Sequence, residues 1–296
     1  MKILTVLICL CVLMGCGEKV EPKQQEEAPS TPKVEANAPV TPKPQPKEEL
    51  ENPQPPKTTP EKLIADPIIE KAIREALSTP FRKFTGELTK ADLEKVTKLY
   101  LYRKQLSEVP KGLEKLTQLT NLSLENDQLT DVKGLEKLNQ LTSLSLYNNQ
   151  LTDVKGLENL TQLKELRLGG NQLTDVKGLE KLTQLTSLSL SGNQLTDVKG
   201  LEKLDQLTSL GLGGNKLTDV KGLEKLDQLK VLNLENNQLT DVKGLEKLDQ
   251  LKQLYLQNNQ LTDVKGLEKL DQLTHLVLDN NPALTKAQIV ELKKAL

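Results

Sequence analysis

The chain has 296 residues with 40 basic and 41 acidic side chains, and its formal net charge of -1 gives no basic field that would favour nucleic acid as a partner. Aromatic residues make up 2% of the chain and tryptophan is absent, so leucine must form the core. All three cysteines lie within the first sixteen residues, which excludes a disulfide framework and thiolate metal sites from the remainder of the chain.

Residues 1–15 have the pattern of a secretory signal peptide. Lys2 precedes a mostly apolar run, residues 3–13, that is too short to span a bilayer. The letters LMGC, which end at Cys16, resemble the bacterial lipobox, and this resemblance implies that the cysteine is acylated and becomes the first residue of the mature protein. The alternative is a plain signal peptide followed by an incidental cysteine.

Acylation of Cys16 also predicts where the protein resides. Several acyl chains on one residue bury enough CH2 groups to hold a protein stably on a membrane. We therefore expect a lipid-anchored protein of the bacterial cell envelope, with the rest of the chain in the periplasm or outside the cell. Gly17 and Glu18 stand where an aspartate-type retention signal would be, which indicates the outer membrane if the cell has one.

Residues 16–60 have the composition of a tether. Eleven of the fifteen prolines lie in residues 18–60, with Lys, Glu, Gln and Thr and almost no large apolar side chains. Such a segment cannot bury enough surface to offset its ordering entropy, so we expect a disordered, extended linker that reaches on the order of 100 Å at about 3.1 Å per residue. A passive linker is favoured over a Pro-rich ligand, because runs such as PKPQP are a weak signal.

Residues 61–95 predict a helical N-terminal cap. Asp66 followed by Pro67 is typical of a helix start, and Thr89 with Asp92 has the spacing of a capping box at a second, short helix. The apolar face of the first helix is predicted to consist of Ile69, Ile73, Ala76 and Leu77. We expect this region to cover the open end of the array that follows, because the first coil would otherwise expose its apolar interior.

A fixed period organises residues 96–281. The decapeptide LTDVKGLEKL begins at Leu129 and recurs further along, with the near-copy LTDVKGLENL at Leu151, and the seven copies are each separated by 22 residues. A repeat array grows by adding units, so this period favours one elongated domain over two ordinary ones.

One unit, residues 129–150, shows how a coil buries its leucines. Apolar residues recur every three positions up to Leu144, which suits 3₁₀-like turns, and Leu146 follows after two, which suits a short strand. Stacked coils bury these side chains against each other, with their strands in a parallel sheet. An inward amide after each strand can satisfy backbone groups that the turn leaves unpaired. These structural asparagines are Asn149, Asn171, Asn193, Asn215, Asn237, Asn259 and Asn281, with Asp127 in the first of these coils.

The stretch LTSLSLYNNQL resembles the signature of leucine-rich repeats. Its continuation into LTDVKGLEKL is similar to the 22-residue subclass of bacterial internalin-type proteins and of a phosphatase-1 regulatory subunit. The resemblance implies an α/β solenoid, a horseshoe or arc with a parallel concave sheet of about nine coils, a 3₁₀ or irregular convex side, a helical N-terminal cap and a C-terminal capping helix. The first coil departs from the pattern at Lys104, where asparagine is expected, and at the extra residue Pro110, so we expect irregularity on its convex side.

Residues 282–296 break the period and predict the closing helix. Thr285 and Gln288 have the spacing of a capping box. The apolar stripe of this helix is predicted to be Ile289, Leu292 and Leu296.

The repeated decapeptide is predicted to form the connecting turn and the convex back of every coil. Its exposed charges sum to zero per coil, and Gly134 is placed where the chain turns tightly or adopts positive φ. The identity of the copies follows either from this structural role or from recent duplication.

The varying residues flank the strand leucines and point to the concave face, because alternate strand side chains face opposite ways. All four tyrosines and the single histidine of the chain lie in these outward positions, and tyrosine is favoured at interfaces. We predict two ligand-binding patches: Tyr100, Tyr102, Arg103, Tyr147 and Arg167 in the N-terminal half, and Tyr255 with His275 in the C-terminal half. The alternative is that the tyrosines merely decorate a sheet that tolerates them well.

Catalytic chemistry has little to build on in this chain. One histidine and no thiol after Cys16 leave no triad and no zinc site, and the glycines of GLGGNKLTDVKG lack the spacing of a nucleotide-binding loop, so no cofactor and no metal are expected. We expect a non-catalytic, membrane-anchored leucine-rich repeat scaffold that binds a protein or a glycan on its concave face. The rival is a structural envelope spacer without a specific ligand, and an enzyme would need an activity with no visible catalytic group.

Overall fold

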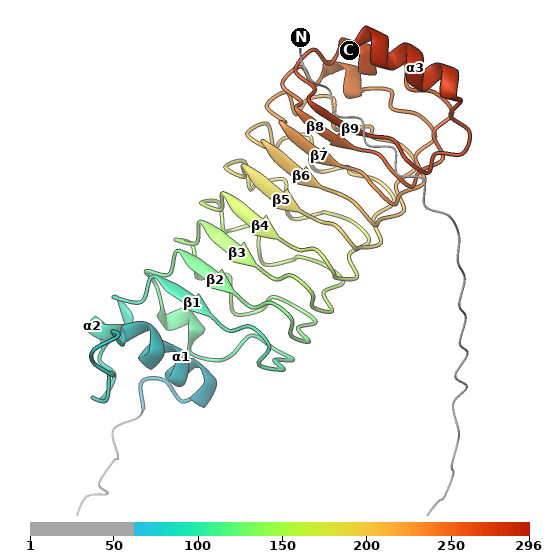
Figure 1. The fold of residues 1–296 in the computed structure, drawn as a ribbon. Coiled ribbons are helices and arrows are strands. Elements are labelled where there is room, and N and C mark those ends of the chain that lie inside the picture. Colours follow the sequence, from blue (N-terminus) through green and yellow to red (C-terminus); the bar gives the residue numbers. More distant parts are fainter. Residues whose placement is uncertain (1–61) are drawn as a thin grey trace, which may run out of the picture. The chain divides into compact units, whose positions relative to one another are not determined.

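The computed structural model describes residues 62–296. The expected signal peptide, the lipidation site Cys16 and the tether up to residue 60 lie outside the described residues. Among those described, no helix is both long enough and apolar enough to cross a membrane. This part of the chain is a solenoid with two helices at its N-terminal end and one at its C-terminal end (Figure 1).

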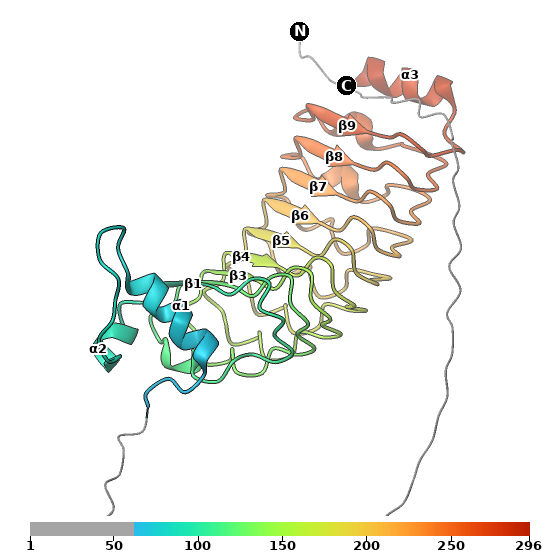
Figure 2. The same cartoon turned by 60° about the horizontal axis from the view of Figure 1, so that its bottom comes forward.

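The strands form one nine-stranded parallel sheet in chain order, which confirms the predicted α/β solenoid. Their central leucines pair in register: Leu122 with Leu144 at an offset of 22 residues, but Leu99 with Leu122 at 23, because the first coil contains the extra residue at Pro110. Figure 2 shows the strands stacked side by side along one face of the array. The strands are β1 (Lys98–Tyr100), β2 (Asn121–Ser123), β3 (Ser143–Ser145), β4 (Glu165–Arg167), β5 (Ser187–Ser189), β6 (Ser209–Gly211), β7 (Val231–Asn233), β8 (Gln253–Tyr255) and β9 (His275–Val277).

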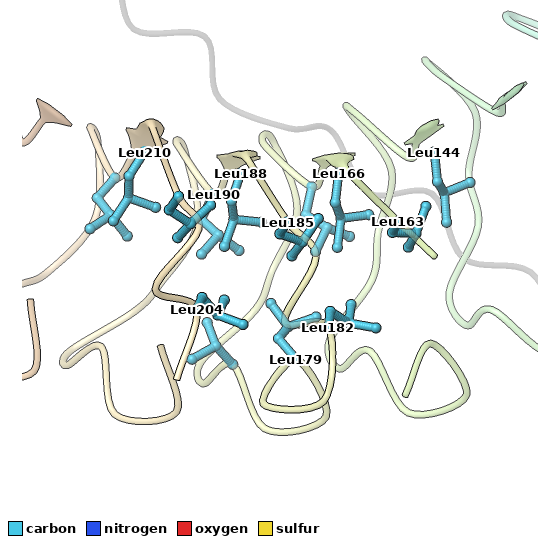
Figure 3. Packing of buried hydrophobic residues seen from close by; sticks show 14 of the residues in the cluster. Leu144, Leu163, Leu166, Leu179, Leu182, Leu185, Leu188, Leu190, Leu204 and Leu210 are labelled. Carbon is cyan, nitrogen blue, oxygen red and sulfur yellow. The ribbon is translucent and has the colours of Figure 1, made fainter. Parts of the chain in front are cut away.

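Leucine forms the core, as the composition requires. In the coil that starts at Leu173, every inward apolar side chain is at most 1% exposed, and the leucines of successive coils interdigitate in two rows (Figure 3). Each buried leucine contributes about 1.5–3 kcal/mol relative to an exposed one. Since no coil can bury these side chains alone, stability comes from the stacking of neighbours.

The side chain of one asparagine per coil completes the hydrogen bonding of the backbone inside the stack. Asn193, for example, accepts a bond from the N–H of Leu173 at 3.0 Å through Oδ1 and donates through Nδ2 to the carbonyls of Leu168 at 3.0 Å and Leu190 at 2.9 Å. All seven asparagines of this ladder are buried and make equivalent bonds. In the first of these coils Asp127 accepts from Lys104 and Leu106 through one oxygen, while its other oxygen is buried without a partner in the described residues.

The decapeptide forms the convex side, where its polar side chains make hydrogen bonds within their own copy. In the copy at Leu173, Asp175 accepts from the N–H of Lys177 at 3.0 Å, and the N–H of Gly178 donates to Glu180 at 2.7 Å. Gly178 has φ of 99°, as its equivalents do within a few degrees, so the predicted positive φ is confirmed. Short 3₁₀ helices form on this side at η1 (Leu113–Lys115), η2 (Leu245–Lys247) and η3 (Leu267–Lys269).

The N-terminal cap consists of α1 (Pro67–Leu77) and α2 (Lys90–Leu93). Asp66 caps α1 by accepting from two backbone N–H groups, and α2 begins with the predicted capping box. The predicted apolar face of α1 is wrong in one residue: Ala76 is exposed, and Ala72 is buried in its place beside Ile69 and Ile73. Leu77, in the last turn of α1, is half-buried and packs against the core, so only Ala76 departs from the predicted face.

The C-terminal cap is α3 (Lys286–Ala295), which packs against η3. The capping box of Thr285 and Gln288 is present, and the amide of Gln288 also donates to the carbonyl of Thr262 at 3.0 Å, which ties the helix to the last coil. Leu292 is buried, while Ile289 and Leu296 are half-buried.

Candidate functional site

The outward side chains of the nine strands form the concave face. Each central strand leucine is buried while its neighbours on either side, except Ser145, reach the surface, so three columns of outward residues run across the coils. In the middle of the face, on β5 and β6, these columns hold only serine and glycine. Larger side chains gather at the two ends of the sheet.

At the N-terminal end the structure places three tyrosines on this face with large exposed surfaces. Tyr100 and Tyr102 are 57% and 59% exposed, and Tyr147, two coils further on, is 47% exposed. The ring of Tyr147 lies over Gly169: a Cβ on that glycine would be 3.3 Å from Cδ2 of Tyr147 and 2.9 Å from the carbonyl of Ser191. The missing side chain at Gly169 therefore lets the tyrosine ring rest against the next coil.

A buried hydroxyl lies in the same row as Tyr100. The register of β1 to β4 aligns Tyr100, Ser123, Ser145 and Arg167 across the sheet. Ser145 is 8% exposed, and its Oγ has no hydrogen-bond partner in the described residues. Because this oxygen is buried, it does not belong to the surface that a ligand on the concave face would contact.

The two arginines of the predicted N-terminal patch lie in different surroundings. Arg167 is already paired, with Nε and NH2 at 2.9 Å and 2.7 Å from one carboxylate oxygen of Glu165. Arg103 has φ of 55° and lines a cavity of about 450 Å³ between α1 and the turn after β1, together with Lys71 and Glu75. The structure thus unites the three tyrosines on one face, while Arg103 borders the cap.

At the C-terminal end the structure places Tyr255 and His275 on neighbouring strands. The hydroxyl of Tyr255 donates to Gln253 at 3.2 Å, and Gln253 is in register with His275. His275 is exposed, and its Nδ1 lies 3.1 Å from the hydroxyl of its neighbour Thr274. Tyr255 and His275 thus lie on neighbouring strands, and each has a different side-chain partner.

Sequence reasoning missed a polar network beside this pair. Glu235 accepts from the side-chain amides of Asn233 and Gln257, and Asp279 follows in the same outward column. Acidic or amide residues at that column in three successive coils are the signal that could have revealed it.

A second missed feature is a column of left-handed residues at the edge of the concave face. Asn148 has φ of 56° and donates to the side chain of Asn126 at 3.0 Å, and Gly170 continues the column with φ of 68°. From the second coil onward every residue of this column is asparagine or glycine, the residue types that adopt this conformation most readily. That restriction was visible in the sequence.

The chemistry of the described residues is that of a surface without a metal cluster. Within residues 62–296 no group of three or more His, Cys, Asp or Glu side chains could hold a metal ion. The concave face exposes aromatic rings, hydroxyls and amides together with charged side chains such as Lys98 and Arg167, and these groups recognise a surface by contact, hydrogen bonding and charge.

Comparison with known proteins gives a family. The model described as leucine-rich repeats, two copies, matches residues 139–181, 161–203, 183–225, 205–247 and 249–291, which together make up about half of the chain. The chain matches no curated protein sequence.

Solved structures give the same answer. Internalin C2 from Listeria monocytogenes is similar with a TM-score of 0.68 and 30% identity, over 74% of this chain and 95% of the other. A leucine-rich repeat protein from Leptospira interrogans has a TM-score of 0.58 and 31% identity, over 70% of this chain and 60% of the other. The ectodomain of the Arabidopsis thaliana receptor kinase GASSHO1/SCHENGEN3, in complex with Casparian strip integrity factor 2, has a TM-score of 0.55 and 28% identity, over 65% of this chain and 25% of the other.

Proposed function

The chain belongs to the leucine-rich repeat family, and on that premise we propose that it is a non-catalytic scaffold that binds a protein ligand on its concave face. The observation that carries the proposal is the exposure of Tyr100, Tyr102 and Tyr147 on a face whose middle holds only serine and glycine. Tyrosine supplies large, rigid contact area at low entropic cost, with a polar tip that selects its partner. Leucine-rich repeat domains commonly bind proteins, and the receptor kinase ectodomain was solved in complex with Casparian strip integrity factor 2.

The proposed ligand site is the N-terminal patch, defined here as Tyr100, Tyr102 and Tyr147. The rings supply the area that excludes water, and their hydroxyl groups supply directional hydrogen bonds. The pair of Tyr255 and His275 is a secondary contact, because its tyrosine hydroxyl is already bonded within the protein.

The proposed cellular setting is a lipid anchor at Cys16 that holds the scaffold on a bacterial envelope membrane, the outer membrane if the cell has one. The lipobox-like letters before Cys16 and the Pro-rich composition of residues 18–60 support this part of the proposal. Substitution Cys16→Ala should release the protein from the membrane fraction of the producing cells. Continued retention of the variant in that fraction would remove the anchor from the account.

The binding proposal is tested by capture with a matched pair of deletions. Removal of residues 129–150 deletes the coil that carries Tyr147, and removal of residues 195–216 deletes a coil with only small outward residues; both removals keep the 22-residue register. Each variant of the 62–296 unit is used to capture proteins from the envelope and surroundings of the producing organism. A partner held by the native unit and by the second deletion, but not by the first, supports the proposal.

The same experiment addresses the rival function, an envelope spacer without a specific ligand. A spacer is indifferent to which coil is removed, since both deletions shorten the array equally. Equal capture by both deletions, or no specific partner of the native unit, would favour the spacer. If the native unit instead bound a glycan and the first deletion lost that binding, the patch would remain the ligand site and only the class of ligand would change.

A further inference from the structure

The loop between α1 and α2 displays a phenylalanine that the cap does not use. Phe81 is 99% exposed, far more than the 47–59% of the concave tyrosines. Its neighbour Phe84 is half-buried, and Arg74 lies 5.8 Å from the centre of its ring. The chain has only these two phenylalanines, and one of them contributes nothing to the core.

A tight turn fixes the position of this exposed ring. The N–H of Thr79 donates to the carbonyl of Arg82 at 2.9 Å, and the N–H of Arg82 donates back to Thr79 at 3.2 Å, so Pro80 and Phe81 form the tip. At the base of the turn Ser78 donates to the carbonyl of Arg74 at 2.6 Å and accepts from the N–H of Phe84 at 3.0 Å. The ring is therefore held away from the apolar surface of the cap.

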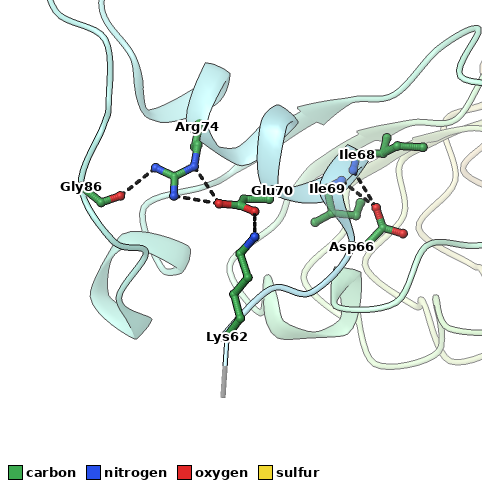
Figure 4. A network of polar contacts seen from close by, with 7 residues as sticks. All are labelled: Lys62, Asp66, Ile68, Ile69, Glu70, Arg74 and Gly86. Carbon is green, nitrogen blue, oxygen red and sulfur yellow. Dashed lines mark hydrogen bonds and ion pairs between the residues drawn. The ribbon is translucent and has the colours of Figure 1, made fainter. Parts of the chain in front are cut away.

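The return of the loop is tied to α1 by a polar network (Figure 4). Arg74 donates to the carbonyl of Gly86 at 2.7 Å and to the carboxylate of Glu70 at 2.8 Å and 3.0 Å. Lys62 pairs with the same carboxylate. These contacts hold both ends of the loop against the helix and leave its tip free.

The charge next to the exposed ring is positive. Arg82 and Lys83 directly follow Phe81, are exposed, and make no ion pair within residues 62–296. With Lys90 they give the loop and the start of α2 three cations against the single carboxylate of Glu87 before Asp92. An aromatic tip flanked by cations matches the surface of an anionic bilayer, where the ring enters the interface and the cations meet lipid phosphates.

We propose that the Thr79–Arg82 turn is a membrane-contact loop that inserts Phe81 into the interface of an anionic phospholipid bilayer. One ring with two cations binds weakly by itself, but a chain held at the same surface raises its effective concentration enough for such a contact to set orientation. The contact would place the N-terminal cap at the membrane and leave the concave face open to its ligand. The orienting effect rests on the proposed anchor at Cys16, but the contact is independent of the concave ligand site, so either of these two sites can fail without the other.

A single tryptophan tests the insertion, because the natural chain has none. The chain from residue 16 onward contains Cys16 as its only cysteine, so that thiol can be coupled to a maleimide-bearing lipid whether or not cells acylate it. Phe81→Trp is then compared with Tyr147→Trp, which places the reporter on the concave patch. Both are measured on vesicles of phosphatidylcholine alone and of phosphatidylcholine with phosphatidylglycerol, with and without brominated acyl chains as quencher.

The proposal predicts blue-shifted emission and quenching by brominated chains for Phe81→Trp on the anionic vesicles only, and neither for Tyr147→Trp. Adding Arg82→Gln and Lys83→Gln should weaken the insertion at least about tenfold, since each basic residue near an anionic surface adds roughly a factor of five. Emission of Phe81→Trp that stays as in solution, equal quenching of both reporters, or equal insertion on neutral vesicles would overturn it.

Discussion

The convex and concave sides of each coil are built from the same chain but under different constraints. On the convex side the polar residues of the decapeptide have local partners, as when the N–H of Gly178 donates to Glu180. On the concave side Ser187, Ser189 and Ser191 occupy positions at which other coils carry arginine, tyrosine or glutamate. Residues that stay the same from coil to coil therefore maintain the fold, and residues that vary from coil to coil form the surface available for recognition.

This contrast gives the decapeptide a structural reason to stay constant. Every apolar letter is buried, the glycine needs positive φ, and the aspartate and glutamate each accept a backbone N–H. Recent duplication would give the same identity, but these contacts would then preserve it.

The largest effect is expected inside the stack. Asn193→Ala leaves the N–H of Leu173 and the carbonyls of Leu168 and Leu190 without their partner, and each unsatisfied buried group costs about 1–3 kcal/mol. We expect a loss of about 3 kcal/mol or more in the free energy of unfolding, measured by urea titration. Gln194→Ala, at an exposed neighbour, is the control and should stay within about 0.5 kcal/mol. Similar values for the two variants would contradict the role of the ladder.

Replacement of the aspartate in the ladder by asparagine is expected to increase stability. Asp127→Asn supplies a donor at the oxygen that now lacks a partner, so we expect about 1–3 kcal/mol of added stability. The reverse change, Asn149→Asp, removes a donor from an otherwise equivalent position and should destabilise by a similar amount. Urea unfolding of both variants measures the difference, and equal signs for the two would refute the explanation.

Two glycines on opposite sides of the coil distinguish the cost of backbone strain from the cost of a steric clash. Gly178 has φ of 99°, but a methyl group added at this residue would have no neighbour closer than 3.6 Å, so Gly178→Ala should cost about 1–2 kcal/mol through backbone strain alone. Gly211, on the concave face, has no positive φ, and its nearest neighbour is the rotatable hydroxyl of Ser191 at 3.1 Å. Gly211→Ala should therefore stay within about 0.5 kcal/mol. Thermal unfolding of the pair measures the contrast, and a larger cost at Gly211 would reverse it.

Acid should weaken the turns of the convex side. The pKa values of Glu158, Glu224 and Glu246 are lowered from the ordinary 4.5, first by the N–H of each glutamate itself and then by the N–H of the glycine just before it in the turn. Because the folded pKa is depressed, this stabilisation is fully present above pH 4.5 and is lost as the pH falls through the folded pKa values. Replacement of all three by glutamine should flatten the dependence of unfolding free energy on pH below 4.5. An unchanged acid slope in the triple variant would contradict this assignment.

The sequence predicts most of the solenoid because period and burial coincide. The spacing from Leu129 to Leu146 was enough to place strand, core and turn, and the structure has them there. The error at Ala76 arose because helical periodicity alone does not tell which of Ala72 and Ala76 is buried on α1.

The candidate site was less predictable than the fold. The outward positions of the tyrosines followed from strand alternation, but the pairing of Arg167 with Glu165 depends on rotamers that no period encodes. The position of Arg103 beside α1 depends on how the cap docks, and the exposure of Phe81 depends on a tight turn outside the repeat. These features depend on the three-dimensional packing of the side chains and not on the period of the sequence.

The most direct test of the account pairs stability with binding in one variant. Tyr100, Tyr102 and Tyr147 are replaced together by alanine in the 62–296 unit, and urea unfolding is measured beside capture of the partner found with the native unit. The account predicts a change in unfolding free energy of less than about 1 kcal/mol, because these side chains are about half exposed, together with loss of capture. Retained capture, or a destabilisation comparable to that of Asn193→Ala, would show that the varying residues serve the fold and would contradict the separation of the two faces.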